Sequence, residues 1–212
     1  MTQKGDLKII LLGESKVGKT TLMIRIIKNE FDNPKTTIGA SYMEKTYEGL
    51  DGKNYLFNIW DTAGQEKFDS LSTFYTRDAG CALILYDITD RKSFLELERF
   101  FKKLEFADEK VFAILIGTKF DLVAENEELR EVSIQEGSEK AKLMNSDFFE
   151  ISSKTTYNID KLFERIGSKY LRIYRSGGKK AKGKKGKQRH SVFVTNLSDD
   201  EENIEKDKKC CK

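Results

Sequence analysis

The chain has 212 residues and a formal net charge of +3, because 38 Lys and Arg stand against 35 Asp and Glu. No apolar run approaches the ~18–20 residues needed to cross a bilayer, which excludes a membrane-spanning helix. Three cysteines exclude a disulfide framework, and one proline with 34% charged residues is typical of a soluble α/β domain with an extension.

The predicted elements alternate between strands and helices. In chain order we expect a strand over residues 7–12, a helix over 21–28, paired strands over 41–50 and 55–60 joined by a tight turn at Asp51 and Gly52, a strand over 80–86, a helix over 91–106, a strand over 111–116, a helix over 133–144, a strand over 148–151 and a helix over 158–174. This alternation predicts a three-layer α/β fold with a mostly parallel six-stranded sheet, one antiparallel edge hairpin and helices on both faces.

Charge and composition divide the chain into two parts. Residues 175–212 carry 12 Lys and Arg against 6 Asp and Glu, whereas residues 1–174 carry 26 against 29. The second part is rich in Gly, Ser and Lys and poor in aromatic residues, a composition typical of disorder. We therefore expect one folded domain over residues 1–174 and a disordered tail over residues 175–212.

Residues 13–20, Gly-Glu-Ser-Lys-Val-Gly-Lys-Thr, lie between the first predicted strand and the first predicted helix. They fit the pattern G-x-x-x-x-G-K-[ST], in which the glycines let backbone N–H groups turn toward a phosphate. In this pattern Lys19 reaches the β- and γ-phosphates, and the hydroxyl of Thr20 binds Mg²⁺. The helix N-terminus adds the positive end of its dipole. The sequence therefore predicts a site for a nucleoside triphosphate.

Polar segments also follow three later strands. Residues 61–66 are Asp-Thr-Ala-Gly-Gln-Glu, residues 117–121 are Gly-Thr-Lys-Phe-Asp, and residues 152–154 are Ser-Ser-Lys. Ligands of open α/β sheets bind beyond the carboxyl ends of the strands. We therefore expect these segments to meet residues 13–20 at one edge of the sheet.

Together these segments resemble the Ras-like small GTPases, and the resemblance covers residues 7–174. It implies that Asp121 accepts two hydrogen bonds from guanine and selects GTP over ATP, while Lys119 packs along the nucleotide and the backbone N–H of Ser153 contacts the guanine oxygen. The implied contacts with GTP or GDP are Ser15, Lys16, Val17, Gly18, Lys19, Thr20, Thr21, Phe31, Thr37, Gly64, Thr118, Lys119, Asp121, Leu122, Ser152, Ser153 and Lys154.

The same resemblance implies a Mg²⁺ site and a catalytic residue. Thr20 and Thr37 are expected to bind the ion directly, and Asp61 to hold it through water. Gly64 is expected to donate its N–H to the γ-phosphate, and Gln65 to orient the attacking water as the catalytic residue. The chain is therefore expected to be an enzyme that hydrolyses GTP slowly, helped by a GTPase-activating protein.

Residues 60–68 and 82–89 are similar to segments of Rab proteins, the part of the superfamily that this chain resembles most. The similarity implies a GTP/GDP switch in vesicle and membrane trafficking, with effectors binding through residues 36–47 and 61–77. It also implies an exchange factor, a Rab escort protein and a GDP dissociation inhibitor as partners. The chain is expected to be a monomer and not to bind nucleic acid.

Cys210 and Cys211 resemble the double-cysteine terminus of Rab proteins, so both are expected to be prenylated. The basic run at residues 179–189 favours attraction to an anionic membrane, with nuclear import or nucleic-acid binding as alternatives. The N-terminus lacks a signal-peptide pattern. We therefore expect the protein at the cytoplasmic face of an intracellular membrane, exchanging with the cytosol.

Two positions near the expected nucleotide depart from the Rab pattern. Thr118 stands where most Rab proteins carry Asn, and Lys16 places an extra cation near the phosphates. One alternative function is a GTP-binding scaffold with negligible turnover, because Lys16 could misplace the attacking water without weakening binding. The other is a Ras-like signalling or cell-division GTPase outside trafficking, favoured by Thr118 and disfavoured by the double cysteine.

Overall fold

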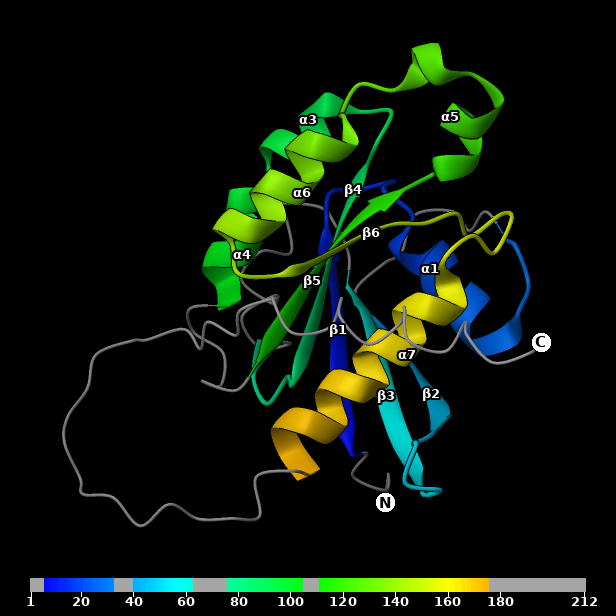
Figure 1. Ribbon diagram of the computed structural model, residues 1–212, viewed down its shortest axis with the longest axis vertical. Helices are drawn as coiled ribbons and strands as arrows, with labels where there is room; N and C mark the ends of the chain where they lie inside the picture. Colours follow the sequence, from blue (N-terminus) through cyan, green and yellow to red (C-terminus); the bar gives the residue numbers. More distant parts are fainter. Residues whose placement is uncertain (1–5, 33–39, 63–75, 105–110, 176–212) are drawn as a thin grey trace, which may run out of the picture. The chain divides into compact units, whose positions relative to one another are not determined.

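The computed structural model describes residues 6–32, 40–62, 76–104 and 111–175. Its centre is a six-stranded sheet in the order β2-β3-β1-β4-β5-β6 (Figure 1). The strands are β1 (Leu7–Gly13), β2 (Ala40–Glu48), β3 (Asn54–Thr62), β4 (Cys81–Asp87), β5 (Phe112–Thr118) and β6 (Asp147–Glu150). Only the β2–β3 pair among them is antiparallel. The predicted sheet, with its antiparallel edge hairpin, is confirmed.

The central strands are apolar throughout because both faces of the sheet are covered. All residues of β4 are buried, and so are all residues of β1 except Lys8 and all residues of β5 except Ala113. Parallel strands buried on two faces need continuous rather than alternating apolar runs. The edge hairpin differs, since buried and less buried residues alternate along most of β3.

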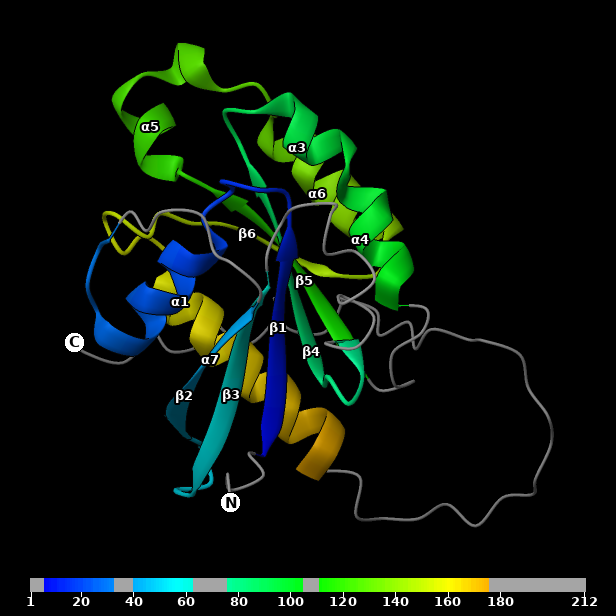
Figure 2. The same cartoon turned by 180° about the vertical axis from the view of Figure 1, so that it is seen from behind.

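Helices cover both faces of this sheet, as Figures 1 and 2 show from opposite sides. On one face, α1 (Lys19–Lys28) and α7 (Ile159–Tyr170) pack against Ile9 and Leu11 of β1. On the other, α4 (Leu97–Lys103) and α6 (Ile134–Leu143) pack against Ile10 and Leu12. Alternation along β1 therefore sends successive side chains into two separate cores.

Three predicted helices differ from the structure in detail. The expected helix over residues 91–106 is divided at Glu96 into α3 (Arg91–Leu95) and α4, and its last two residues lie outside the described ranges. The last helix ends at Tyr170 and continues as a π-helical turn, η4 (Leu171–Arg175). The helix over residues 21–28 begins earlier, at Lys19. Two short elements, α5 (Phe120–Glu125) and η3 (Glu127–Leu129), were not predicted.

The described residues contain no helix that is both long enough and apolar enough to span a bilayer. The predicted tail lies outside the described residues except for Arg175, so the boundary between residues 174 and 175 stays a prediction.

Candidate functional site

The carboxyl ends of β1, β3, β5 and β6 bring the expected segments to one edge of the sheet. The register aligns Leu11 of β1 with Asp61 of β3, and Gly117 of β5 with Glu150 of β6. Each of these strands then leaves the sheet within a few residues of that level. The site is therefore assembled by parallel pairing of strands that lie far apart in the sequence.

The loop of residues 13–18 depends on two glycines with positive φ. Gly13 has φ +145°, and a Cβ there would collide with the backbone carbonyl of Leu85 and crowd the side chain of Val17. Gly18 has φ +94° directly before α1, a conformation that residues other than glycine rarely adopt. Lys16 also has a positive φ of 67° and is exposed at the loop. The backbone of this loop therefore requires glycine at positions 13 and 18.

Lys19 begins α1 and is only 6% exposed. Its ammonium donates to the carbonyl oxygens of Gly13, at 2.9 Å, and of Glu14, at 2.6 Å. Burial lowers the pKa of Lys19 to about 8, although the carboxylates of Asp61 and Glu14 raise it in part. A buried cation inside a glycine loop and at a helix N-terminus fits a phosphate anion.

The expected Mg²⁺ ligands Thr20 and Asp61 lie together. The hydroxyl of Thr20 donates to Oδ2 of Asp61 at 2.5 Å, although the two residues are 41 positions apart. Asp61 is fully buried, and the neighbouring Thr62 hydroxyl fixes the end of β3 by donating to the carbonyl of Leu11 at 2.7 Å. A hydroxyl beside a carboxylate fits Mg²⁺, which prefers oxygen ligands and keeps several waters.

The rest of the expected metal and catalytic set lies outside the described residues, namely Thr37, Gly64 and Gln65. Within the described ranges, no group of three or more His, Cys, Asp or Glu side chains could hold a metal ion. The fit to Mg²⁺ therefore rests on the Thr20 hydroxyl and the Asp61 carboxylate.

Asp121 and Ser152 form the centre of the expected base site. The Ser152 hydroxyl donates to Oδ1 of Asp121 at 2.6 Å, and both residues are buried. Oγ of Ser152 also accepts hydrogen bonds from the backbone N–H groups of Lys154, at 3.2 Å, and Thr155, at 3.1 Å. One hydroxyl thus fixes the Asp121 carboxylate and the turn of the Ser-Ser-Lys segment together, the two parts of the expected guanine contact.

Thr118 connects the base site to the phosphate loop. Its hydroxyl lies 2.7 Å from the carbonyl oxygen of Val17 and 2.9 Å from that of Tyr86. Because a hydroxyl carries a single proton, it can donate fully to only one of these carbonyls at a time. Threonine therefore makes this connection with one donor.

Two residues that the sequence did not single out support the base site. Asp87 accepts an ion pair from Lys119 at 2.5 Å between Nζ and Oδ2, and so holds a side chain expected along the nucleotide. Arg25 of α1 is buried and donates from Nε to the carbonyl of Ser153 at 2.6 Å. The only signal for Arg25 was a charged residue inside the apolar face of α1.

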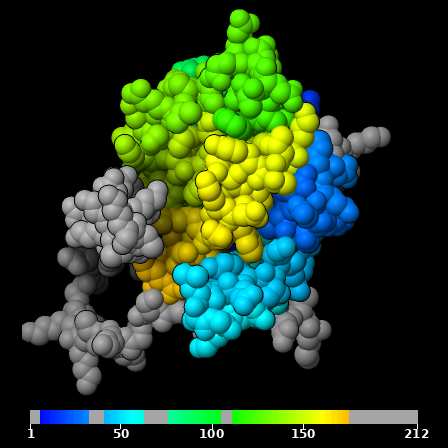
Figure 3. All heavy atoms as spheres, turned by 45° about the vertical axis from the view of Figure 1, so that its right-hand side comes forward, coloured from blue at the N-terminus to red at the C-terminus, as the bar shows by residue number. Residues whose placement is uncertain are grey.

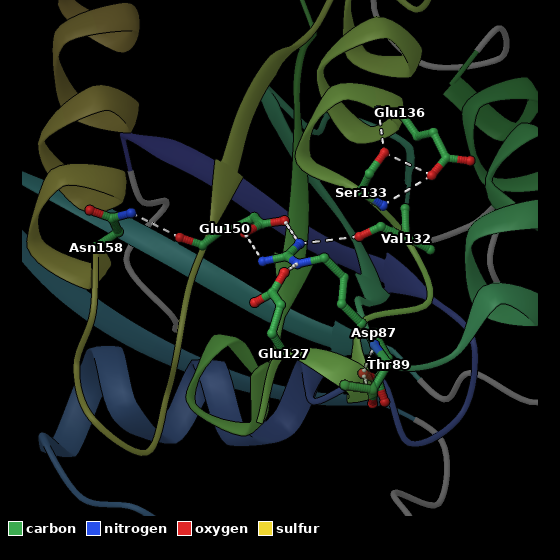
Figure 4. A network of polar contacts seen from close by, with 9 residues as sticks. Asp87, Thr89, Glu127, Val132, Ser133, Glu136, Glu150 and Asn158 are labelled. Atoms are coloured by element: carbon green, nitrogen blue, oxygen red, sulfur yellow. Dashed lines mark hydrogen bonds and ion pairs between the residues drawn. The ribbon is translucent and has the colours of Figure 1, made fainter. Parts of the chain in front are cut away.

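A second group of polar contacts surrounds Glu150 at the end of β6 (Figure 4). Arg130 forms a two-pronged ion pair with Glu150, at 2.6 and 3.1 Å, and also contacts Glu127 at 2.9 Å. The side chain of Asn158 donates to the carbonyl of Glu150 at 2.9 Å. These contacts hold the strand end from which Ser152 departs.

The positions of the remaining predicted residues complete the set, and the roles of all of them stay predictions. Phe31 follows α1 and is 51% exposed, so its contact with the base stays a prediction. Ser15, Val17 and Thr21 belong to the phosphate loop and the start of α1, and Leu122 lies in α5. The described part of the expected effector surface includes residues 40–47, which lie in the edge strand β2.

Comparison with known proteins gives consistent similarities. The Ras family model matches residues 8–172. GTP-binding protein ypt2 of Schizosaccharomyces pombe is 42% identical over 160 residues, covering 74% of this chain and 77% of the relative. Ras-related protein Rab-17 of Mus musculus is 39% identical over 166 residues, with 77% and 75% covered. GTP-binding protein ypt5 of Schizosaccharomyces pombe is 37% identical over 164 residues, with 76% of each covered. Because the family match spans the sheet edge described above and most of the chain, this protein belongs to the Ras family and is a Rab-like GTPase.

Proposed function

We propose that this chain acts as a GTP/GDP switch in vesicle and membrane trafficking, and that its nucleotide lies along the carboxyl edge of the sheet. One observation carries the proposal: the Asp121 carboxylate, fixed by Ser152, shares that edge with the buried ammonium of Lys19. A group suited to guanine and a group suited to phosphate thus belong to one site.

The proposed roles follow the chemistry of each group. Lys19 would neutralise the β- and γ-phosphates, while Thr20, Thr37 and Asp61 would hold Mg²⁺. When bound there, Mg²⁺ would offset the negative charge that develops on the phosphates. Gly64 would donate its N–H to the γ-phosphate, and Gln65 would orient the attacking water, so that hydrolysis depends on positioning and electrostatics.

The proposed partners and location follow the Rab-type relatives. We expect effectors at residues 36–47 and 61–77, and control by an exchange factor, a GTPase-activating protein, an escort protein and a GDP dissociation inhibitor. Prenyl groups on Cys210 and Cys211 would anchor the chain to the cytoplasmic face of an intracellular membrane, because stable anchoring needs two signals. The relatives' names support trafficking over signalling or cell division, and imaging of the tagged chain in its own cells tests this.

Calorimetry with GTP and ATP tests the nucleotide assignment. We expect GTP to bind at least ~10³ times more tightly than ATP, because adenine would leave the polar groups of the site unpaired. Such a mismatch can reduce recognition by a factor of about 10⁴–10⁵. Asp121→Asn should shift the preference toward xanthosine triphosphate, since its amide can donate to the 2-oxygen. Asp160→Asn, the same charge change on the exposed start of α7, is the control. Equal affinities for GTP and ATP would contradict the proposal.

A further inference from the structure

Two aromatic side chains join the two segments of the base site, the start of α5 and the loop after β6. Phe120 lies between Lys119 and Asp121, and Tyr157 lies in the loop after β6. Their rings are stacked, with centroids 4.3 Å apart and planes inclined by 16°. In Figure 3 the yellow surface that follows β6 lies against the green surface of the segment containing α5. The stack therefore connects the start of α5, which carries Asp121, to the loop that carries Ser152 and Ser153.

The backbone around Tyr157 is held in an uncommon conformation. Thr156 and Asn158, on either side, have φ of 67° and 58°, in the left-handed region that few residues other than glycine adopt. The loop is closed by a hydrogen bond from the N–H of Ser152 to the carbonyl of Tyr157, at 3.2 Å. Conformations of this kind persist where surrounding contacts fix them. Here they flank Tyr157, whose ring stacks on Phe120.

The stack lies next to the atoms that recognise guanine. Phe120 directly precedes Asp121, and its N–H donates to the carbonyl of Ile151 at 3.0 Å. The Ser152 hydroxyl then joins Asp121 at 2.6 Å. The two segments are thus connected at three levels: by backbone at Ile151, by the Ser152 hydroxyl, and by the rings.

We propose that Tyr157, stacked on Phe120, is a positioning residue that sets guanine selectivity by holding the Asp121 carboxylate in register with the Ser152–Ser153 backbone. This inference rests on the proposed nucleotide site. Offset-stacked rings attract each other beyond the area that they bury, and they resist sliding of one segment over the other. Because Tyr157 is 44% exposed, its truncation leaves both cores of the domain intact.

The test compares GTP with inosine triphosphate, which lacks the 2-amino group that donates to Asp121. Dissociation constants of both nucleotides are measured with Mg²⁺ for the full chain and for Tyr157→Ala, Tyr157→Phe and Leu129→Ala. Leu129 is the matched control, because it is 46% exposed, lies in η3 and is not a member of the stacked pair. Phe120→Leu is the second variant and removes the partner ring.

In the unmodified chain we expect GTP to bind about tenfold or more tightly than inosine triphosphate, the fold-change of one hydrogen bond to a charged group. Tyr157→Ala should lower this ratio at least ~3-fold, Phe120→Leu should do the same, and the double variant should add little, as expected for residues in contact. Tyr157→Phe and Leu129→Ala should leave it unchanged.

An unchanged ratio in both Tyr157→Ala and Phe120→Leu would overturn the positioning role, even if both nucleotides bound more weakly, because a merely structural loop contact lowers the two affinities equally. Failure of the nucleotide assignment itself looks different: the unmodified chain would then bind ATP as well as GTP.

Discussion

At Lys19, burial favours the neutral amine, whereas binding a phosphate favours the charged ammonium. Burial lowers its pKa to about 8, whereas lysine in an unfolded chain titrates near ~10.4. Between these values the unfolded chain holds more protons, so the contribution of Lys19 to folding stability rises with pH from about 8 to about 10.5. Below pH ~8 the charged form is buried at full cost. A phosphate anion beside the ammonium offsets that cost.

We therefore expect nucleotide binding to take up protons at Lys19. The phosphates raise the pKa of the ammonium, so at pH 8 about half a proton should be bound with each nucleotide, and almost none at pH 7. Calorimetric titration with GDP and Mg²⁺ in buffers of different ionisation enthalpy measures this uptake. Lys16→Ala, which removes the exposed lysine of the same loop, should leave it unchanged. Binding heats that do not depend on the buffer at pH 8 would contradict the assignment.

Thr118 makes a second residue-level prediction. Thr118→Val keeps the shape of the side chain but removes the hydroxyl that lies within hydrogen-bond distance of the carbonyls of Val17 and Tyr86. Leaving buried carbonyls without this donor costs about 1–3 kcal/mol, so GDP should dissociate roughly 5- to 150-fold faster. Thr118→Asn supplies two N–H donors and should slow dissociation or leave it unchanged.

Release of a fluorescent GDP analogue measures both Thr118 variants, with Thr46→Val on the exposed face of β2 as the control. Equal rates for Thr118→Val and the unmodified chain would mean that the phosphate loop and β5 are held by other contacts.

Between elements, an ion pair connects α4 to the phosphate loop. Arg99 donates to the carboxylate of Glu14, and both side chains are only partly exposed. A carboxylate next to a polyphosphate site opposes binding, and a guanidinium beside it cancels that repulsion. The pair thus has an electrostatic role and a structural one, and these predict different outcomes when both partners are changed.

We expect Arg99→Ala to weaken GTP binding about two- to fivefold, the size typical of a partly exposed ion pair, and less at high salt. Adding Glu14→Gln should restore the affinity, because no carboxylate is left to neutralise. Equilibrium titration at two salt concentrations checks this, with Lys92→Ala on the exposed face of α3 as the control. If the double variant stays as weak as Arg99→Ala, the pair instead holds α4 against the loop.

The elements that the sequence predicted well are those with a strong local pattern. The apolar run of β4 and the segment from β1 through the glycines to α1 needed no distant information. By contrast, α5 and η3 are too short to show a helical period, and the apolar pattern of residues 91–106 continues across the division at Glu96. Local backbone geometry, which hydrophobic spacing does not encode, decides such details.

The candidate site divides in the same way. Asp121, Ser152 and Lys19 were predicted because each belongs to a short motif. Arg25 was not, because its contact with Ser153 spans 128 positions and its sequence signal is one charge within an apolar helix face. The stack of Phe120 on Tyr157 was missed for a similar reason, since aromatic residues in loops carry no pattern that pairs them.

In the molecule as a whole, the site joins segments from nearly the full length of the folded domain. The phosphate loop begins at Gly13, Asp61 follows in β3, and Asp121 and Ser152 come from the ends of β5 and β6. A local contact fixes only the segments that it joins, whereas one nucleotide bound at this edge would contact all four. Ligand binding should therefore be coupled to the global stability of the domain.

We expect GDP with Mg²⁺ to raise the midpoint of thermal unfolding strongly. A ligand at 1,000 times its dissociation constant adds about 4.1 kcal/mol to the free energy of unfolding. For a domain of this size each kcal/mol shifts the midpoint by about 2–4 °C, which gives a rise of about 8–16 °C. The midpoint should climb with the logarithm of GDP concentration, while ATP at equal concentration should leave it nearly unchanged. Asp121→Asn should remove the response to GDP and gain one to xanthosine diphosphate. An equal rise with ATP would mean that the phosphates alone stabilise the domain and that the ends of β5 and β6 do not take part in binding.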